Sequence, residues 1–167
     1  RLPDQTRDVD FPGGKFNMTD VSAAIGRAQL KKLDAFCAHR RQLAQHYLKR
    51  LPSILARDLL PHSGHAGDED GHSWNLFAIR LPFAGLRMSR PQIMDAMKTR
   101  GVATSVSYES PHLTSLFLKQ GWKRGDLPNT ELIADTTLTL PLHAGLSESD
   151  VEYVCDSLAA VLQEARR

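Results

Sequence analysis

The sequence predicts an α/β fold of the α+β type: a small, mostly antiparallel sheet with packed helices, preceded by a long helical arm. Apolar residues recur at helical spacing in the segments 20–51 and 151–162. Between these segments, three short runs of alternating or β-branched residues predict strands. We therefore expect residues 1–18 to form a loop with a polar turn, residues 19–52 the helical arm, and residues 53–167 a small α/β domain.

The helical arm begins at Thr19, whose side chain suits an N-cap, and Asp20 places a negative charge where the helix dipole favours it. Two apolar stripes follow on different sides, as in helices that lie between two neighbours. The pattern ends at Pro52, and its length fits either two consecutive helices or one kinked helix. The stripes consist of Val21, Ala24, Ile25 and Ala28, and of Leu30, Leu33 and Cys37.

Three strands are expected in the small domain. In the first, Phe77, Ile79 and Leu81 alternate with other residues up to Pro82. The second covers residues 102–108, which are rich in β-branched residues, and the third covers residues 136–140. Together they predict a three-stranded sheet.

Helices are expected between and after these strands. Ser89, Arg90 and Pro91 open a helix that stops at Gly101, and residues 128–135 predict a short one. In the last helix, Ser147 and Asp150 form a capping box, and one apolar stripe follows. This stripe consists of Val151, Val154, Cys155, Leu158 and Leu162.

Composition excludes several classes of protein. The chain has 167 residues, of which 41% are hydrophobic and 24% charged, as in soluble globular domains. Its net charge of +2 is too small to indicate a nucleic-acid partner, and no apolar run approaches the ~18 residues that a membrane span needs. Cys37 and Cys155 both lie in apolar helical patterns, so we expect two buried thiols and a cytoplasmic protein. Because the chain starts at Arg1 rather than Met, we expect it to be a piece of a longer protein.

Two sequence features have a simpler explanation than a binding site. Residues 22–33 have the small-residue rhythm of a helix-turn-helix, but Gly26 lies inside an unbroken helical pattern, so we expect no nucleic-acid partner. A loop at residues 62–72 contains metal-binding side chains, but their spacing matches no compact zinc or EF-hand pattern. We expect a solvated loop and no metal site. Its side chains are His62, His65, Asp68, Glu69, Asp70 and His72.

Two further polar groups are candidates for ligand contact. Lys15 and Asn17 precede a helix N-terminus, where unpaired N–H groups and the dipole attract anions such as phosphate. Ser107, Tyr108 and His112 follow a predicted strand, and strand ends in α/β layers often line sites. A lone histidine at such a place can also be structural. Neither group contains the nucleophile and base that covalent catalysis requires.

Four segments resemble one known family, in order and with its spacing. Residues 13–34 read GGKFNMTDVSAAIGRAQLKKLD, and residues 72–82 read HSWNLFAIRLP. Residues 101–113 read GVATSVSYESPHL, and residues 127–154 read LPNTELIADTTLTLPLHAGLSESDVEYV. Together they resemble the C-terminal part of the DegT/StrS-type nucleotide-sugar aminotransferases, which are fold-type I enzymes that use pyridoxal 5′-phosphate.

This resemblance implies an activity for a longer protein. Members usually act as homodimers and move an amino group from glutamate, which becomes 2-oxoglutarate, onto a nucleotide-linked keto sugar. The Schiff-base lysine belongs to a large domain upstream, and no lysine here stands at its position. We therefore expect no catalytic residue in this chain, no transaminase activity of the chain alone, and an exposed apolar face on residues 21–28, which would pack on that domain. The alternative is a non-catalytic binding or oligomerisation module of the same fold.

The resemblance also suggests roles for the polar residues. Lys15 and Asn17 occupy the turn that reaches the neighbouring subunit's active site in the family, and are expected to contact the cofactor phosphate or the substrate. Tyr108 and His112 match the segment that lines the sugar-nucleotide pocket, whereas Ser107 replaces a histidine. Within the family, residues 15–20 and 72–74 look most like enzymes that make 4-amino-4-deoxy-arabinose on a uridine nucleotide for lipid A modification.

Overall fold

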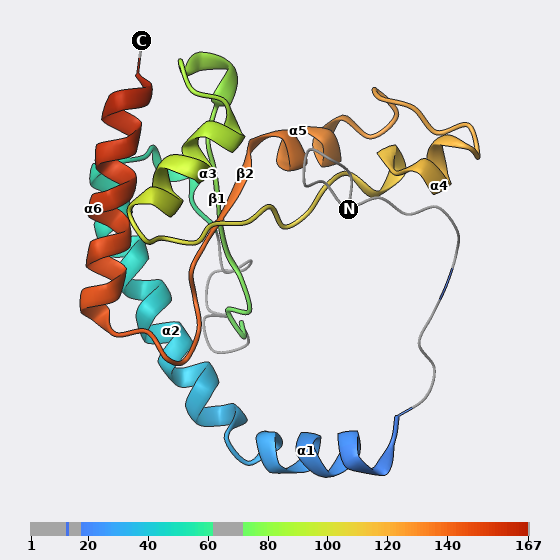
Figure 1. Ribbon diagram of the computed structural model, residues 1–167, viewed down its shortest axis with the longest axis vertical. Coiled ribbons are helices and arrows are strands. Elements are labelled where there is room, and N and C mark those ends of the chain that lie inside the picture. Colours follow the sequence, from blue (N-terminus) through green and yellow to red (C-terminus); the bar gives the residue numbers. More distant parts are fainter. Residues whose placement is uncertain (1–12, 14–17, 62–71, 167) are drawn as a thin grey trace.

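Figure 1 shows the computed structural model, which describes residue 13, residues 18–61 and residues 72–166. Its two strands run through the middle of the molecule, with α2 and α6 side by side on one flank. Short 3₁₀ turns cover Leu51–Ser53, Arg57–Leu59, Phe83–Gly85 and Pro111–Leu113. The remaining elements are α1 (Asp20–Leu30), α2 (Leu33–Arg50), β1 (Phe77–Arg80), α3 (Arg90–Thr99), α4 (Ser115–Leu118), α5 (Pro128–Thr136), β2 (Thr137–Leu140) and α6 (Glu148–Ala165).

The prediction of a three-stranded sheet is wrong for the strand expected at residues 102–108. β1 and β2 pair antiparallel, with Phe77 opposite Leu140 and Arg80 opposite Thr137. Within the part of the chain that the structure describes, residues 102–108 contribute only an isolated bridge between Ser105 and Thr139 on the other side of β2. β-branched residues favour an extended backbone there, but a strand also needs a continuous partner, and the chain leaves the edge of β2 after Ser105.

The centre of the core is an aromatic stack. The rings of Tyr47 on α2 and Phe77 on β1 lie 4.6 Å apart, and Trp74 stacks on the other side of Phe77 at 5.9 Å. The hydroxyl group of Tyr47 donates a hydrogen bond of 2.9 Å to the carbonyl oxygen of Pro141, which satisfies its one polar atom. This contact ties α2 to the segment that follows β2.

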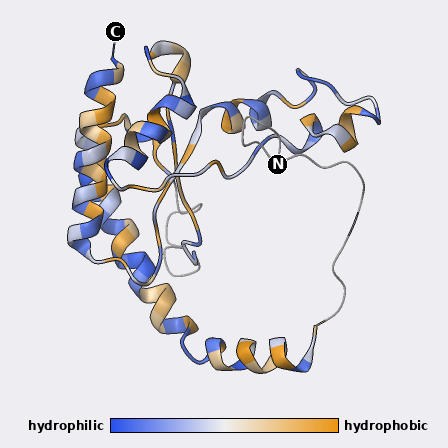
Figure 2. Cartoon of the chain, viewed as in Figure 1, coloured by the Kyte–Doolittle hydropathy of each residue, from blue (hydrophilic) through white to orange (hydrophobic). Residues whose placement is uncertain are grey.

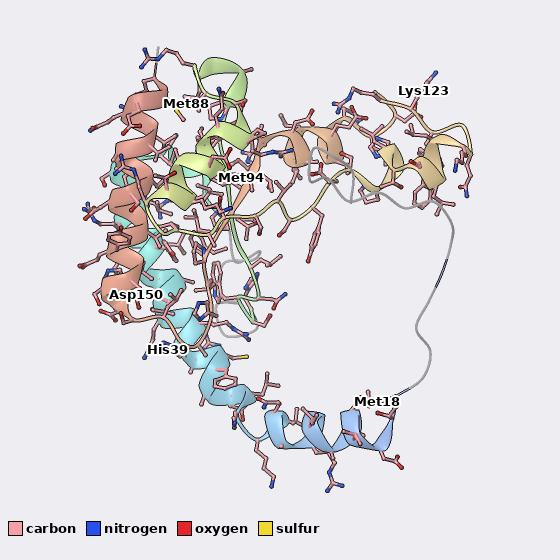
Figure 3. All side chains as sticks on the ribbon, in the orientation of Figure 1. Met18, His39, Met88, Met94, Lys123 and Asp150 are labelled. Atoms are coloured by element: carbon pink, nitrogen blue, oxygen red, sulfur yellow. The ribbon has the colours of Figure 1, made fainter. Side chains whose placement is uncertain are left out.

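α6 closes the core by packing against both α2 and α3. It starts at the predicted capping box: the hydroxyl oxygen of Ser147 accepts from the backbone N–H of Asp150 at 3.2 Å, and the Asp150 carboxylate accepts from the Ser147 N–H at 2.8 Å. The apolar stripe predicted for this helix is buried. At the same end, His39 of α2 lies 2.8 Å from the carbonyl oxygen of Leu146, and Figure 3 labels both His39 and Asp150.

Loss of this cap should be measurable. We expect Ser147→Ala to lower the free energy of unfolding by about 1 kcal/mol, because the N–H of Asp150 loses its acceptor. Urea unfolding followed by circular dichroism measures the change. The matched control is Thr19→Ala, which removes the same kind of cap from α1, where no residue is buried. We expect a smaller loss of unfolding free energy in the control, because α1 packs on no core. Equal losses in the two variants would contradict a specific role for the Ser147 cap in global stability.

α1 projects away from the core, and Figure 2 colours several of its residues as hydrophobic. Val21 is 71% exposed and Ile25 58% exposed, which confirms the predicted exposed apolar face. The long pattern is two consecutive helices, with a break at Lys31 and Lys32. The second helix, α2, contributes to the core, because its residues Leu43, Ala44 and Tyr47 are buried.

The prediction for the two cysteines holds for one of them. Cys155 is buried on α6, whereas Cys37 is only half-buried. Cys37 lies in the first half of α2, before the buried residues begin, and there Arg40 donates a 3.4 Å hydrogen bond to the sulfur atom. Among the described residues, no helix has the length and apolar character to cross a membrane.

Candidate functional site

The candidate site is built on residues 107–113, here called the 107–113 segment, which follows the bridge between Ser105 and β2. Ser107 is half-buried, and Tyr108 is 62% exposed. His112 lies in the 3₁₀ turn Pro111–Leu113 and is only 4% exposed. The three predicted substrate residues therefore lie on one segment, but in very different surroundings.

His112 is held by a hydrogen bond with Glu131 of α5. Its Nε2 lies 2.9 Å from the Oε1 of Glu131, and the side chains of both residues are at most 9% exposed. The Trp122 ring meets the imidazole edge-on at 6.3 Å. The Nδ1 atom of His112 is buried and has no hydrogen-bond partner among the described residues. His112 is therefore a packed, paired residue rather than an open surface group.

Glu131 gathers several donors around one carboxylate. Its Oε1 also accepts a 2.8 Å hydrogen bond from the backbone N–H of Gly125, and Arg124 lies 3.7 Å from Oε2. The hydrogen bond with His112, and after it the backbone donors and Arg124, hold the pKa of Glu131 below its usual value although burial opposes this. The carboxylate is therefore charged at neutral pH. Through His112, Arg124 and Gly125, the Glu131 carboxylate holds residues 111–126 against α5. This stretch contains α4 and Lys123, which Figure 3 labels.

Arg90 makes a second connection around the segment. From the first turn of α3, its guanidinium donates to the carbonyl oxygens of Ala134 and Thr137, at the junction of α5 and β2. It also lies 3.9 Å from the carboxylate of Glu109, inside the 107–113 segment. Arg90 thus connects α3, α5 and the candidate site through one side chain.

The other predicted site residues fall outside this description. Lys15 and Asn17 lie outside the described residues, as does the loop 62–71 of the possible metal site. His72, at the end of that loop, accepts from the backbone N–H of Trp74 through Nδ1 at 2.9 Å. Within the described ranges, no three residues of the metal-binding types come together.

Glu131 and Arg90 were missed by sequence reasoning. Glu131 occupies the first turn of α5, where an acidic residue is ordinary because of the helix dipole. Arg90 reads equally well as an exposed residue beside Pro91. Their partners lie 19 and 44 residues away, at His112 and Ala134, so no local pattern reveals them.

Comparison with known proteins gives a family match over almost the whole chain. The profile of the DegT/DnrJ/EryC1/StrS aminotransferase family matches residues 3–159. Among solved structures, the aminotransferase TlmJ from Streptoalloteichus hindustanus is 32% identical over 87% of this chain, with a TM-score of 0.66. DesV from S. venezuelae is 27% identical over 83% of this chain, with a TM-score of 0.69.

A third structure extends the match in fold. The putative sugar aminotransferase Spr1654 from Streptococcus pneumoniae, in its PLP-form, is 23% identical over 94% of this chain, with a TM-score of 0.77. The chain covers 36% of TlmJ, 35% of DesV and 39% of Spr1654. It therefore spans a little over a third of the length of these proteins. The helix-rich fold with its small antiparallel sheet matches fragments of fold-type I aminotransferases.

Proposed function

The chain belongs to the DegT/DnrJ/EryC1/StrS aminotransferase family, and from this premise we propose that it forms the C-terminal part of an aminotransferase dependent on pyridoxal 5′-phosphate. The family match over residues 3–159 is the observation that carries the proposal. The reaction would move an amino group from glutamate to a nucleotide-linked 4-keto sugar. When bound, the cofactor supplies the electron sink that such transfers need.

The polar residues of the chain suit contact with ligands better than chemistry on them. Lys15 and Asn17 offer an ammonium group and an amide N–H, a donor set that fits an anionic phosphate. We propose that they complete the cofactor site of a neighbouring subunit in a homodimer. The Schiff-base lysine would belong to a domain upstream of this chain.

The 107–113 segment would face the sugar nucleotide. Tyr108, at 62% exposure, offers both a ring and a hydroxyl group to a ligand. Ser107, half-buried beside it, replaces the histidine that is usual in the family. The resemblance of residues 15–20 and 72–74 extends the proposal to a uridine-linked 4-keto pentose, used in the cytoplasm for the modification of lipid A.

The test compares the full-length protein with the 167-residue chain. After addition of pyridoxal 5′-phosphate and removal of the excess, we expect the full-length protein to show the visible absorption band of bound cofactor and the chain alone to show none. Glutamate should abolish the band, and the keto sugar should restore it with release of the amino sugar. Absorbance and mass spectrometry measure these steps.

The alternative function is a non-catalytic binding or oligomerisation module. The exposed apolar face of α1, with Val21 and Ile25, is the observation in its favour. A full-length protein that forms stable dimers, but takes up no cofactor, would support this alternative and contradict the proposed transaminase function. The upstream coding sequence also separates the two, because the transaminase requires a cofactor-binding lysine there.

A further inference from the structure

We infer that Glu131 is a positioning residue of the candidate site: it fixes His112 with its proton on Nε2 and so holds the 107–113 segment, whose exposed Tyr108 makes the ligand contact. The contact with a ligand rests on the proposed function. The pairing itself rests on the geometry of the described residues. Glu131 is therefore distinct from the groups that touch a substrate.

The location of the proton follows from the other contacts of Glu131. Its Oε1 accepts from the N–H of Gly125, which can only donate, and Arg124 faces Oε2. Both carboxylate oxygens are therefore acceptors, and the 2.9 Å contact requires a donor on the imidazole of His112. Nδ1 is buried without a partner in the described part of the chain, so an N–H there would be unsatisfied. The tautomer with the proton on Nε2 satisfies both conditions.

The pair fixes one of two ends of the 107–113 segment. At the first end, Ser105 exchanges backbone hydrogen bonds with Thr139 of β2, at 3.1 and 2.8 Å. At the second end, His112 is held by Glu131 of α5. α5 ends at Thr136 and β2 starts at the next residue, so both anchors belong to one continuous unit. Between them, Tyr108 is presented to solvent at 62% exposure.

Burial separates the role of His112 from that of Tyr108. At 4% exposure, with Glu131 on one edge and Trp122 against the ring, His112 offers little surface to a ligand. It acts through the backbone that it holds. A fixed backbone reduces the entropy that is lost when Tyr108 binds a ligand. The effect is therefore expected in KM rather than in kcat.

Kinetics of the full-length protein test the inference. We expect Glu131→Ala to raise the KM for the keto sugar nucleotide about tenfold, with kcat changed less than about twofold, because a buried charged hydrogen bond is lost. Glu131→Gln should restore KM to within about threefold, since its amide oxygen still accepts from Nε2. Asp95→Ala, which removes an exposed carboxylate from α3, is the matched control and should leave KM unchanged.

A second substitution tests whether Glu131 acts through Tyr108. Tyr108→Ala should itself raise KM. In a variant that already lacks the Tyr108 side chain, Glu131→Ala should raise KM little further, because two residues that act through the same contact have non-additive effects. The inference would be overturned if the double variant raised KM by the product of the two single-variant effects. An unchanged KM in Glu131→Ala, with an active wild type, would also overturn it while leaving the proposed function in place.

A spectroscopic readout is independent of activity. In the ¹⁵N-labelled 167-residue chain at neutral pH, we expect the ring nitrogens of His112 to show a proton on Nε2, both in the wild type and in Glu131→Gln. Glu131→Leu should give mixed tautomers. A proton on Nδ1 alone in the wild type, or the wild-type pattern in Glu131→Leu, would overturn the pairing. A wild type without transaminase activity would instead refute the proposed function and leave this readout to decide the pairing.

Discussion

Phe77→Ala is expected to lower the free energy of unfolding of the chain by about 3–5 kcal/mol. Phe77 is fully buried on β1, and its ring lies between those of Tyr47 and Trp74, at 4.6 and 5.9 Å. Removal of the ring deletes its transfer free energy and leaves a cavity that two rigid aromatic side chains cannot fill. The loss is a large fraction of the stability of an ordinary domain, so part of the variant should be unfolded at 37 °C.

The chain contains a matched control for this experiment. Phe36→Ala deletes the same side chain from the first half of α2, where Phe36 is 37% exposed, and we expect a loss below about 1 kcal/mol. Urea unfolding, followed by tryptophan fluorescence and circular dichroism, measures both variants. Equal losses would show that the stack of Tyr47, Phe77 and Trp74 is not the centre of the core.

Cys155 is expected to react with iodoacetamide at pH 8 about 10³-fold more slowly than an ordinary exposed thiol. Burial, with smaller contributions from Asp156 and Glu152, raises the pKa of the Cys155 thiol to about 12, although Arg50 opposes the shift. Only the thiolate reacts, and a raised pKa means that less thiolate is present at a given pH. Between pH 7 and pH 9 the rate should therefore rise about tenfold for each pH unit, in step with the thiolate fraction.

Mass spectrometry of peptides from the alkylated protein measures the modification of each cysteine separately. Cys37 is the internal control, because it is half-buried and should be labelled first. In denaturing urea both cysteines should react at similar rates, since the buried environment of Cys155 is lost. Modification of native Cys155 as fast as in urea would contradict its place in the packed face of α6.

Most helices of this protein could be predicted because their signals are local. The capping box of Ser147 and Asp150, and the stripe that follows it, lie within one helix, and the structure confirms both. The end of the arm before Pro52 and the short helix from Pro128 were predicted for the same reason, since proline restricts the backbone next to it. The strand predicted at residues 102–108 failed because a strand depends on a partner elsewhere in the chain.

The candidate site was predicted only in part. The resemblance located the 107–113 segment but did not distinguish the exposed Tyr108 from the buried His112. Burial depends on what packs against a residue, and His112 is covered by Trp122 and Glu131, which follow it by 10 and 19 residues. The expected roles of Lys15 and Asn17 stay predictions.

The sequence by itself determined the family, the order of the helices and the residue types available for ligand contact, because periodicity, caps and motifs are written in neighbouring residues. Only the tertiary structure decided the extent of the sheet, the exposure of each site residue and the pairing of His112 with Glu131. Those features are contacts between residues far apart along the chain. Their free energies arise from burial and hydrogen bonding in the folded molecule, which no local pattern contains.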